Sequence, residues 1–176
     1  MLLGRFPVVR ASSLFYYAKG GDVAQILYAM KYHARKKLCC RMGEYMAGEL
    51  CDSGFFEGID YLLPVPLFSS RLRQRGYNQS ELLARGISCV TGIPLCTDAV
   101  VRSRNNATQT HKSGYARWQN VDRLFLPTPH AANLHDKHIL LVDDVLTTGA
   151  TLVACADALL GVENIKISVL TLAWVR

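Results

Sequence analysis

Residues 139–151 constrain the fold of this chain more than any other segment. Four apolar residues, 139–142, lead directly into the carboxylates of Asp143 and Asp144, and a glycine among small and hydroxylated residues follows. An apolar helical pattern then begins. This order predicts a buried strand, a polar loop at its carboxyl end and the start of a helix. Ligands bind at this end of the strands in open α/β sheets, so we expect a binding site here.

The rest of the chain alternates extended and helical patterns. Its 176 residues are 50% hydrophobic and 19% charged, which predicts one domain over residues 1–176 with a sizeable core. Because strands alternate with helices, the sheet should be largely parallel. Residues 102–120 lack periodicity and should form a long loop. We expect helices at residues 22–30, 37–50, 81–90 (capped by Ser80) and 152–159, and strands at residues 60–66, 99–101, 138–142 and 165–172.

Composition excludes several classes of protein. No apolar run approaches the roughly 18 residues of a membrane span, so we expect no such span. The first 13 residues show no signal-peptide pattern, which makes the cytoplasm the expected location. None of the six cysteines forms a C-x-x-C pair. This spacing disfavours a zinc site of the ribbon type, and a disulfide scaffold is not expected in a cytoplasmic chain.

The net charge of +6 is unevenly distributed along the chain. Residues 1–42 hold eight lysines and arginines and one acidic residue, whereas residues 43–70 hold five acidic residues and neither lysine nor arginine. Residues 71–123 hold nine lysines and arginines and three acidic residues. Two basic regions suit an anionic partner such as nucleic acid, polyphosphate or an acidic protein. A surface that is simply basic remains the alternative.

The segment after the two aspartates has the composition of a phosphate site. Gly149 permits a close approach of the backbone or a positive φ, and backbone N–H groups at a helix start bind anions. Threonine hydroxyls add further donors. The G-x-x-x-x-G-K pattern of a P-loop is absent. The segment therefore predicts a site for one terminal phosphate, formed by Thr147, Thr148, Gly149, Ala150 and Thr151.

Asp143 and Asp144 cannot face that phosphate. Two unit charges about 4 Å apart repel by roughly 4 kcal/mol at an effective dielectric constant of about 20. Ribose hydroxyls or a Mg²⁺ complex are natural partners for these carboxylates. A diol at one end and a phosphate at the other describe a ribose 5-phosphate. The alternative is a turn at the end of the strand, in which the aspartates only cap the helix.

Four sets of residues resemble a known family. Residues 142–151 resemble the motif that binds phosphoribosyl pyrophosphate (PRPP) in type I phosphoribosyltransferases. Residues 64–67 and 71–84, residues 101–121, and residues 30–32 resemble the ComF (competence protein F, GntX-like) family. The resemblance covers about residues 15–173. It implies an α/β fold of the type I phosphoribosyltransferase kind: a mostly parallel sheet flanked by helices, a flexible loop and a small N-terminal helical hood.

The resemblance also implies roles for individual residues. Asp143 and Asp144 would hold the ribose hydroxyls, and residues 147–151 the 5-phosphate. The loop after β-strand residues 60–66 would receive the pyrophosphate, and residues 102–117 would form a lid. Asn78 and Gln79 either shape the pyrophosphate loop or cap a helix, and His111 is interpreted as a surface histidine. Catalysis is assigned to Asp143, Asp144, Arg104 and Lys112, with Arg117 as a further lid cation, and the pyrophosphate loop to Pro66, Leu67, Arg71, Arg73 and Arg75.

Two functions follow from this resemblance. The first is a Mg²⁺-dependent transfer of ribosyl 5-phosphate from PRPP to an unknown acceptor, in which the ion comes with PRPP and no protein group ligates it directly. The second is a non-catalytic module for DNA uptake or use, which binds single-stranded DNA or acts beside a DNA-uptake helicase. A homodimer is left open. Members of the family often begin with a four-cysteine zinc ribbon, which is expected to be absent here because no cysteine precedes Cys39.

Overall fold

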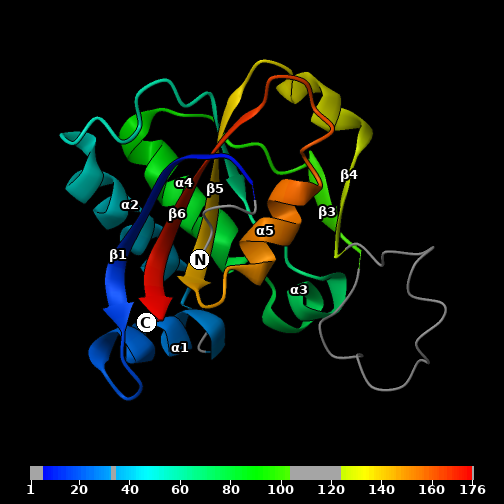
Figure 1. Cartoon of the computed structure of the whole chain (residues 1–176). Helices are drawn as coiled ribbons and strands as arrows, with labels where there is room; N and C mark the ends of the chain where they lie inside the picture. The colour runs from blue at the N-terminus through cyan, green and yellow to red at the C-terminus, as the bar shows by residue number, and fades with distance from the viewer. Residues whose placement is uncertain (1–5, 33–34, 104–123, 176) are drawn as a thin grey trace.

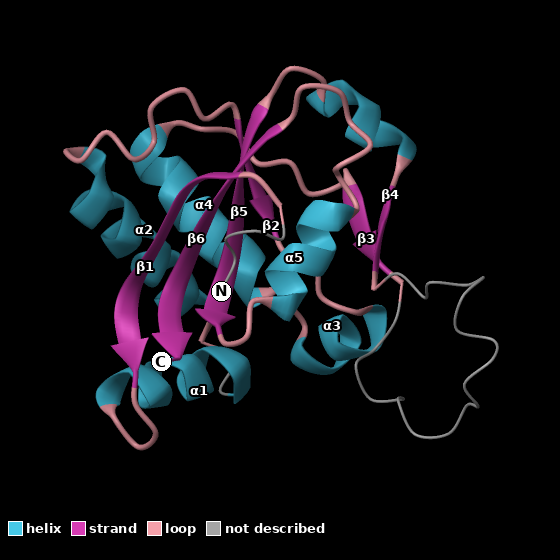
Figure 2. Cartoon of the chain, viewed as in Figure 1, coloured by secondary structure: helices cyan, strands magenta, loops and turns pink. Residues whose placement is uncertain are grey.

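The computed structural model describes residues 6–32, 35–103 and 124–175 (Figure 1). Among these residues, four parallel strands form a central sheet in the order β1-β6-β5-β2 (Figure 2). The prediction of a mostly parallel sheet flanked by helices is therefore confirmed. The sheet strands are β1 (Val8–Tyr17), β2 (Tyr61–Pro64), β5 (His138–Leu146) and β6 (Lys166–Val175).

Hydrophobic cores lie on both faces of this sheet. Helices α1 (Asp22–Tyr32), α2 (Lys36–Cys51) and α4 (Gln79–Thr91) pack on one face. The other face carries α5 (Ala150–Asp157) and a small antiparallel pair, β3 (Val100–Arg102) and β4 (Phe125–Pro127), followed by the short 3₁₀ helix η1 (Pro129–Leu134). None of the described helices has the length and hydropathy needed to cross a bilayer.

The apolar run of β5 is explained by burial on two sides. Ile139 and Leu141 enter the core beneath α5, whereas Leu140 and Val142 enter the core beneath α1, α2 and α4. All four side chains are fully buried. A strand covered on both faces shows no alternation of polar and apolar residues, which is why the sequence reads as one continuous apolar segment.

Two strands were not predicted from the sequence: the sheet strand β1 and the short strand β4. β1 forms one edge of the sheet and pairs with β6, yet its sequence is interrupted by Arg10 and two serines. The Arg10 guanidinium donates to the backbone carbonyls of Gly54 and Phe55, at 3.1 and 2.6 Å. These tertiary contacts stabilise the Arg10 side chain in the strand. The sequence pattern around Arg10 does not indicate them.

Among the predicted boundaries that differ from the structure, two concern residues of the candidate site. β5 continues to Leu146, so Asp143 and Asp144 lie inside the strand rather than in a loop after it. The pairing with β6 continues as far as Leu146 and Trp174, which holds this stretch extended. At α4, the cap is Asn78, whose side chain accepts from the backbone N–H of Ser80 at 3.2 Å. The helix begins at Gln79, so Ser80 is its second residue and not its cap.

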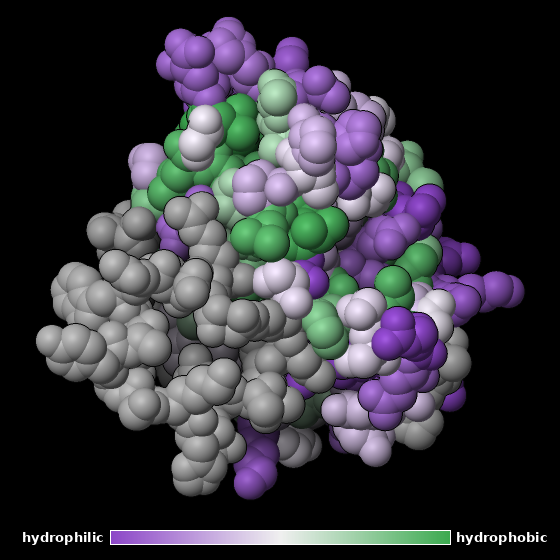
Figure 3. Space-filling view, turned by 90° about the vertical axis from the view of Figure 1, so that its right-hand side faces the viewer, coloured by the Kyte–Doolittle hydropathy of each residue, from purple (hydrophilic) through white to green (hydrophobic). Residues whose placement is uncertain are grey.

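The basic stretch after β2 contains a further helix, α3 (Ser69–Arg75), that was not predicted. Gly76 ends it in the left-handed conformation, with φ of 75°. On the same side of the molecule, Val101 and Leu126 of β3 and β4 are 47% and 42% exposed. The space-filling view of that side shows hydrophobic surface bordered by hydrophilic side chains (Figure 3).

Helices α2 and α4 cross at two glycines. A Cβ atom placed on Gly43 would overlap the backbone carbonyl of Leu83, and one placed on Gly86 would overlap the backbone carbonyl of Cys40. Only hydrogen at these two positions lets the backbones approach so closely. The crossing brings α4 against β5 and β2, and thereby fixes where its amino terminus lies.

We expect Gly43→Ala and Gly86→Ala each to lower the free energy of unfolding by about 1–3 kcal/mol or more, because backbone atoms must move apart. Gly48→Ala is the matched control. Gly48 lies in the same helix as Gly43 and is exposed, and a Cβ atom placed on it would meet nothing within 4 Å. This control should gain up to about 1 kcal/mol from helix propensity. Urea unfolding followed by circular dichroism measures all three, and equal stability of Gly43→Ala and Gly48→Ala would contradict the crossing.

Candidate functional site

A cavity of about 180 Å³ lies where β2 and β5 end. Residues 65–67 line it immediately after β2, and residues 143–145 line it from β5. Four further segments contribute: the end of α1, helix α3 with the start of α4, the end of β3, and the turn between β5 and α5. Polar and charged side chains dominate the lining. The sheet thus places the chemistry at the carboxyl ends of its strands, as expected from the sequence.

Asp143 is held by two donors. Its Oδ1 atom accepts from the Ser80 hydroxyl and from the backbone N–H of Asp144, each at 2.9 Å. Burial, and secondly the charge of Asp144, raise the pKa of Asp143 to about 7. The two donors and Lys31 act in the opposite direction and only partly offset this rise. The Asp143 carboxyl is therefore poised to change charge near neutral pH.

Asp144 forms an ion pair with a residue that the site prediction missed. The Lys31 Nζ atom lies 2.8 Å from Asp144 Oδ2, and the two side chains are 23% and 11% exposed. Lys31 belongs to the last turn of α1, where a cation also favours the negative end of the helix. A lone lysine at a helix end gives no sequence signal of a site. Only residues 30–32 as part of the family resemblance pointed to it.

The segment after β2 is fixed from two sides. The backbone N–H of Val65 donates to the Val142 carbonyl at 2.9 Å, and the Asn78 amide donates to the Val65 carbonyl at 3.0 Å. Asn78 therefore both caps α4 and shapes this loop, so the two alternatives left open by the sequence hold together. Gln79 accepts from Arg75 at 3.1 Å and donates to the Met30 carbonyl at 3.4 Å. Pro66 and Leu67 line the cavity beside these contacts.

Four cationic side chains line the cavity: Lys31, Arg71, Arg75 and Arg102. Arg75 also lies over the ring of Tyr32, 5.5 Å from its centroid. Arg102 was not predicted as a site residue. Its guanidinium lies 5.3 Å from the centroid of the Phe125 ring, and burial, followed by the charge of Arg71, lowers its pKa. Arg73 is exposed and does not line the cavity.

The turn between β5 and α5 presents some of its predicted residues to the cavity. Gly149 adopts the left-handed conformation, with φ of 81°, and precedes the first turn of α5. The Thr148 hydroxyl accepts from the backbone N–H of Ala150 at 3.4 Å, which turns it toward the helix start. Thr147 and Thr151 line the cavity, whereas Thr148, Gly149 and Ala150 do not. Arg104, His111, Lys112 and Arg117 lie outside the described residues.

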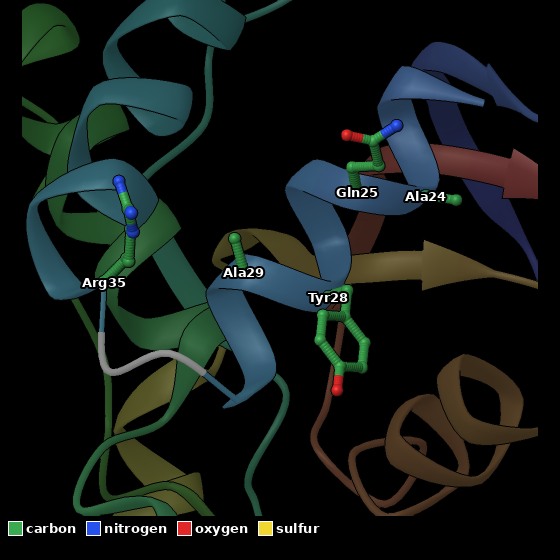
Figure 4. Close-up of a pocket in the computed structure, with 5 residues that line it drawn as sticks. All are labelled: Ala24, Gln25, Tyr28, Ala29 and Arg35. Atoms are coloured by element: carbon green, nitrogen blue, oxygen red, sulfur yellow. The ribbon is translucent and has the colours of Figure 1, made fainter. Parts of the chain in front are cut away.

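A larger hollow lies away from these groups. Its volume is about 450 Å³, and it is lined by Ala24, Gln25, Tyr28 and Ala29 of α1 together with Arg35, which precedes α2 (Figure 4). Arg35 is the one charged residue in this lining. Because no carboxylate, thiol or hydroxyl-bearing turn accompanies it, we place the candidate site in the smaller cavity.

Much of the chain is similar to known proteins. Residues 73–173 match the family described as phosphoribosyl transferase domain. The chain is 37% identical over 108 residues to competence protein F of Haemophilus influenzae, which covers 60% of this chain and 47% of that protein. It is 30% identical over 142 residues to the DNA utilization protein YhgH of Escherichia coli (strain K12), which covers 78% of this chain and 61% of that protein.

Two further proteins are similar to this chain. Competence protein ComFC of Bacillus subtilis is 34% identical over 99 residues, which covers 56% of this chain and 38% of that protein. The chain thus spans at most about three fifths of these curated relatives. Among solved structures, a purine phosphoribosyltransferase from Pyrococcus horikoshii is 18% identical, with a TM-score of 0.43 over 76% of this chain and 74% of that one.

The raised pKa of Asp143 predicts a pH-dependent stability. The folded chain keeps the Asp143 proton up to about pH 7, whereas the unfolded chain releases it near the ordinary aspartate pKa of 3.8. The folded state therefore binds more protons between these values, and its stability falls as pH rises through this window. Asp143→Asn keeps the Oδ1 acceptor but cannot ionise. We expect this variant to be more stable than the native chain above pH 8, by on the order of 2 kcal/mol.

Calorimetric melting between pH 5 and pH 8.5 measures this difference. Asp157→Asn serves as the control, because Asp157 is exposed at the end of α5 and its replacement should leave the slope unchanged. If the stability of the native chain and of Asp143→Asn changes with pH in the same way, ionisation of buried Asp143 does not lower the stability of the fold.

Proposed function

We propose a function for this chain from the premise that it belongs to the ComF family of the phosphoribosyltransferase superfamily. The proposal is that the cavity binds PRPP and supports transfer of its ribosyl 5-phosphate to an acceptor, with release of pyrophosphate. One observation carries the proposal: a carboxylate pair, a threonine-bearing turn at a helix start and four cations converge on a single cavity at the ends of β2 and β5.

Each part of PRPP can be assigned to the cavity residues whose charge or hydrogen-bonding groups suit it. Asp143 and Asp144 are hydrogen-bond acceptors and suit the two ribose hydroxyls. The turn with Thr147 and Thr151 suits the 5-phosphate, because its hydroxyls and the amino terminus of α5 favour an anion. Thr148, Gly149 and Ala150 would act through the backbone of this turn. The aspartates and the threonine turn are thus separate positions for the ribose hydroxyls and the 5-phosphate, which are also separate groups in PRPP.

The pyrophosphate group would lie beside residues 65–67. Arg71 and Arg75 line the cavity from α3, and Arg102 from the end of β3. Arginine forms paired hydrogen bonds with phosphate oxygens, and these are stronger than bonds between neutral groups. Arg75 is oriented by Gln79 and by the ring of Tyr32, so its guanidinium is already placed for an anion.

The donor groups fit magnesium only as part of a complex with the ligand. Within the described residues, no cluster of three histidine, cysteine, aspartate or glutamate side chains could hold a metal. Magnesium in such sites keeps several waters and binds through one or two carboxylates together with phosphates of the substrate. Here both carboxylates are assigned to the ribose hydroxyls, so the ion would come with PRPP and have no direct ligand from the protein. The ion would neutralise charge on the pyrophosphate.

The reaction breaks the bond between ribose C1 and the pyrophosphate oxygen, and pyrophosphate leaves with the bonding electron pair. The acceptor then forms its bond to C1 and loses a proton. Positive charge on the ribose and negative charge on pyrophosphate develop together, so carboxylates near the sugar and cations near the leaving group stabilise the transition state. We further propose residues 102–117 as the lid, with Arg104, Lys112 and Arg117 as added cations.

Binding of PRPP with Mg²⁺, measured by titration calorimetry, tests the proposal. We expect the native chain to bind, and the Asp143→Ala, Asp144→Ala double variant to bind much more weakly. Arg75→Gln should weaken binding by roughly 10-fold or more, because a charge-assisted hydrogen bond contributes about 1.5–3 kcal/mol. Arg73→Gln is the matched control and should stay within about 3-fold, because Arg73 lies on the same helix outside the cavity.

Equal effects of Arg73→Gln and Arg75→Gln would contradict the placement of the pyrophosphate. Incubation with PRPP, Mg²⁺ and a series of bases and amines then tests transfer itself, through release of pyrophosphate. Binding of PRPP without release for any acceptor would leave the chain as a PRPP-binding protein rather than a transferase.

We propose single-stranded DNA binding as a second function, for one specific reason. Arg75, which lines the cavity, lies over the ring of Tyr32. Lys36 lies 5.7 Å from the centroid of the Tyr77 ring, which is buried. Tyr32 is 63% exposed. Aromatic rings interleaved with basic side chains are typical of surfaces that bind single strands. The names of relatives in DNA utilization and competence are consistent with this use.

Fluorescence anisotropy with a labelled oligothymidine measures this binding. We expect affinity to fall steeply with salt, because phosphate contacts release counterions, with a slope of log affinity against log salt of about −0.7 per contact. Tyr32→Ala should weaken binding at every salt concentration, whereas Tyr45→Ala, an exposed tyrosine on α2, should not. No binding at low salt would exclude direct contact with DNA.

A further inference from the structure

The last turn of α1 touches the candidate site through three consecutive residues. The Met30 carbonyl accepts from the Tyr77 hydroxyl at 2.5 Å and from the Gln79 amide at 3.4 Å. Lys31 pairs with Asp144, and the Tyr32 ring lies beneath Arg75. The turn is thus tied to α3 and α4 on either side of Lys31. Its backbone is held without help from the Lys31 side chain.

The contact between Lys31 and Asp144 competes with the role proposed for Asp144. The Lys31 ammonium group contacts Asp144 Oδ2, and the aspartate side chain is only 11% exposed. A ribose hydroxyl that reaches this carboxylate must therefore displace or share the ammonium. Losing the ion pair costs free energy, because a largely buried carboxylate beside Asp143 would lack its counter-ion. A ligand that offers the ammonium another anion removes this cost.

The same cavity offers such a position. Lys31 lines it together with Arg71, Arg75 and residues 65–67, where the proposed function places the pyrophosphate. Arg75 is fixed by Gln79 and Tyr32, whereas lysine carries its charge on a flexible four-carbon stem. Rotation of its side chain can therefore move the charge of Lys31 from the carboxylate to the ligand.

Resting on the proposed function, we propose that Lys31 makes the site selective for a pyrophosphorylated ribose over a ribose monophosphate. Its ammonium neutralises Asp144 until the ligand binds, and then moves to the pyrophosphate as the ribose hydroxyl takes its place on Asp144. Ribose 5-phosphate has the diol and the 5-phosphate but no pyrophosphate at C1. It must break the ion pair without a replacement, so it is disfavoured.

Calorimetry with PRPP and with ribose 5-phosphate, each with Mg²⁺, tests this exchange on the full chain. For Lys31→Met we expect PRPP affinity to fall at least 10-fold, while ribose 5-phosphate affinity is unchanged or higher. Lys31→Gln is a second neutral variant that can still donate to Asp144, and it should behave alike if Lys31→Met folds poorly. Lys37→Met is the matched control, because Lys37 is exposed on α2 and outside the cavity.

The outcomes separate the two proposals. If the native chain binds both ligands but Lys31→Met and Lys31→Gln weaken both equally, or neither, the exchange is wrong and the proposed function stands. Equal weakening would mean that Lys31 only holds Asp144 in place. If the native chain binds neither ligand, the proposed function is wrong, and the exchange falls with it. If Lys37→Met also lowers the affinity for PRPP, the effect of the Lys31 variants reflects only the overall charge of the chain, and the exchange is wrong.

Discussion

The crossing of α2 and α4 at Gly43 and Gly86 is the constraint on which the rest of the structure depends. It allows α4 to lie against β5 and β2 while α2 covers its outer side. The amino terminus of α4 is thereby brought to the strand ends, where Asn78 holds the loop after β2 and Ser80 holds Asp143. Neither glycine lines the cavity, yet their close contact sets the position of groups that do.

The site brings groups of like charge close together in the folded chain. Asp143 and Asp144 are neighbours along β5, and four cations share their cavity. Burial makes the charge of Asp143 unfavourable, and Lys31 offsets the charge of Asp144. Such an arrangement lowers stability and favours a ligand that brings both hydroxyl donors and anions. This trade between stability and binding is common where a site is assembled before its ligand arrives.

The sequence predicted those parts of the site that are contiguous in the chain. The aspartates and the threonine turn follow a clear apolar run, which reflects the burial of β5 on both faces. Lys31 and Arg102 were missed because only tertiary packing brings them to β5. The contrast between Arg75 and Arg73 was missed because α3 is short and lacks apolar periodicity. Once the helix is known, the spacing of 71 and 75 places both on one side and 73 on another. β1 was missed because its polar residues are satisfied by distant partners.

The pairing of β1 with β6 and the ion pair of Lys31 have a consequence for where a minimal fragment of this chain begins. Residues 73–173 match the phosphoribosyl transferase domain, yet β1, β2 and Lys31 all precede them. A fragment cut at residue 73 would lose two of the four strands in the described sheet, and both flanks of the β5–β6 pair would become open edges. Asp144 would lose its counter-ion as well. The segment that matches the phosphoribosyl transferase domain is smaller than the segment that builds the described sheet.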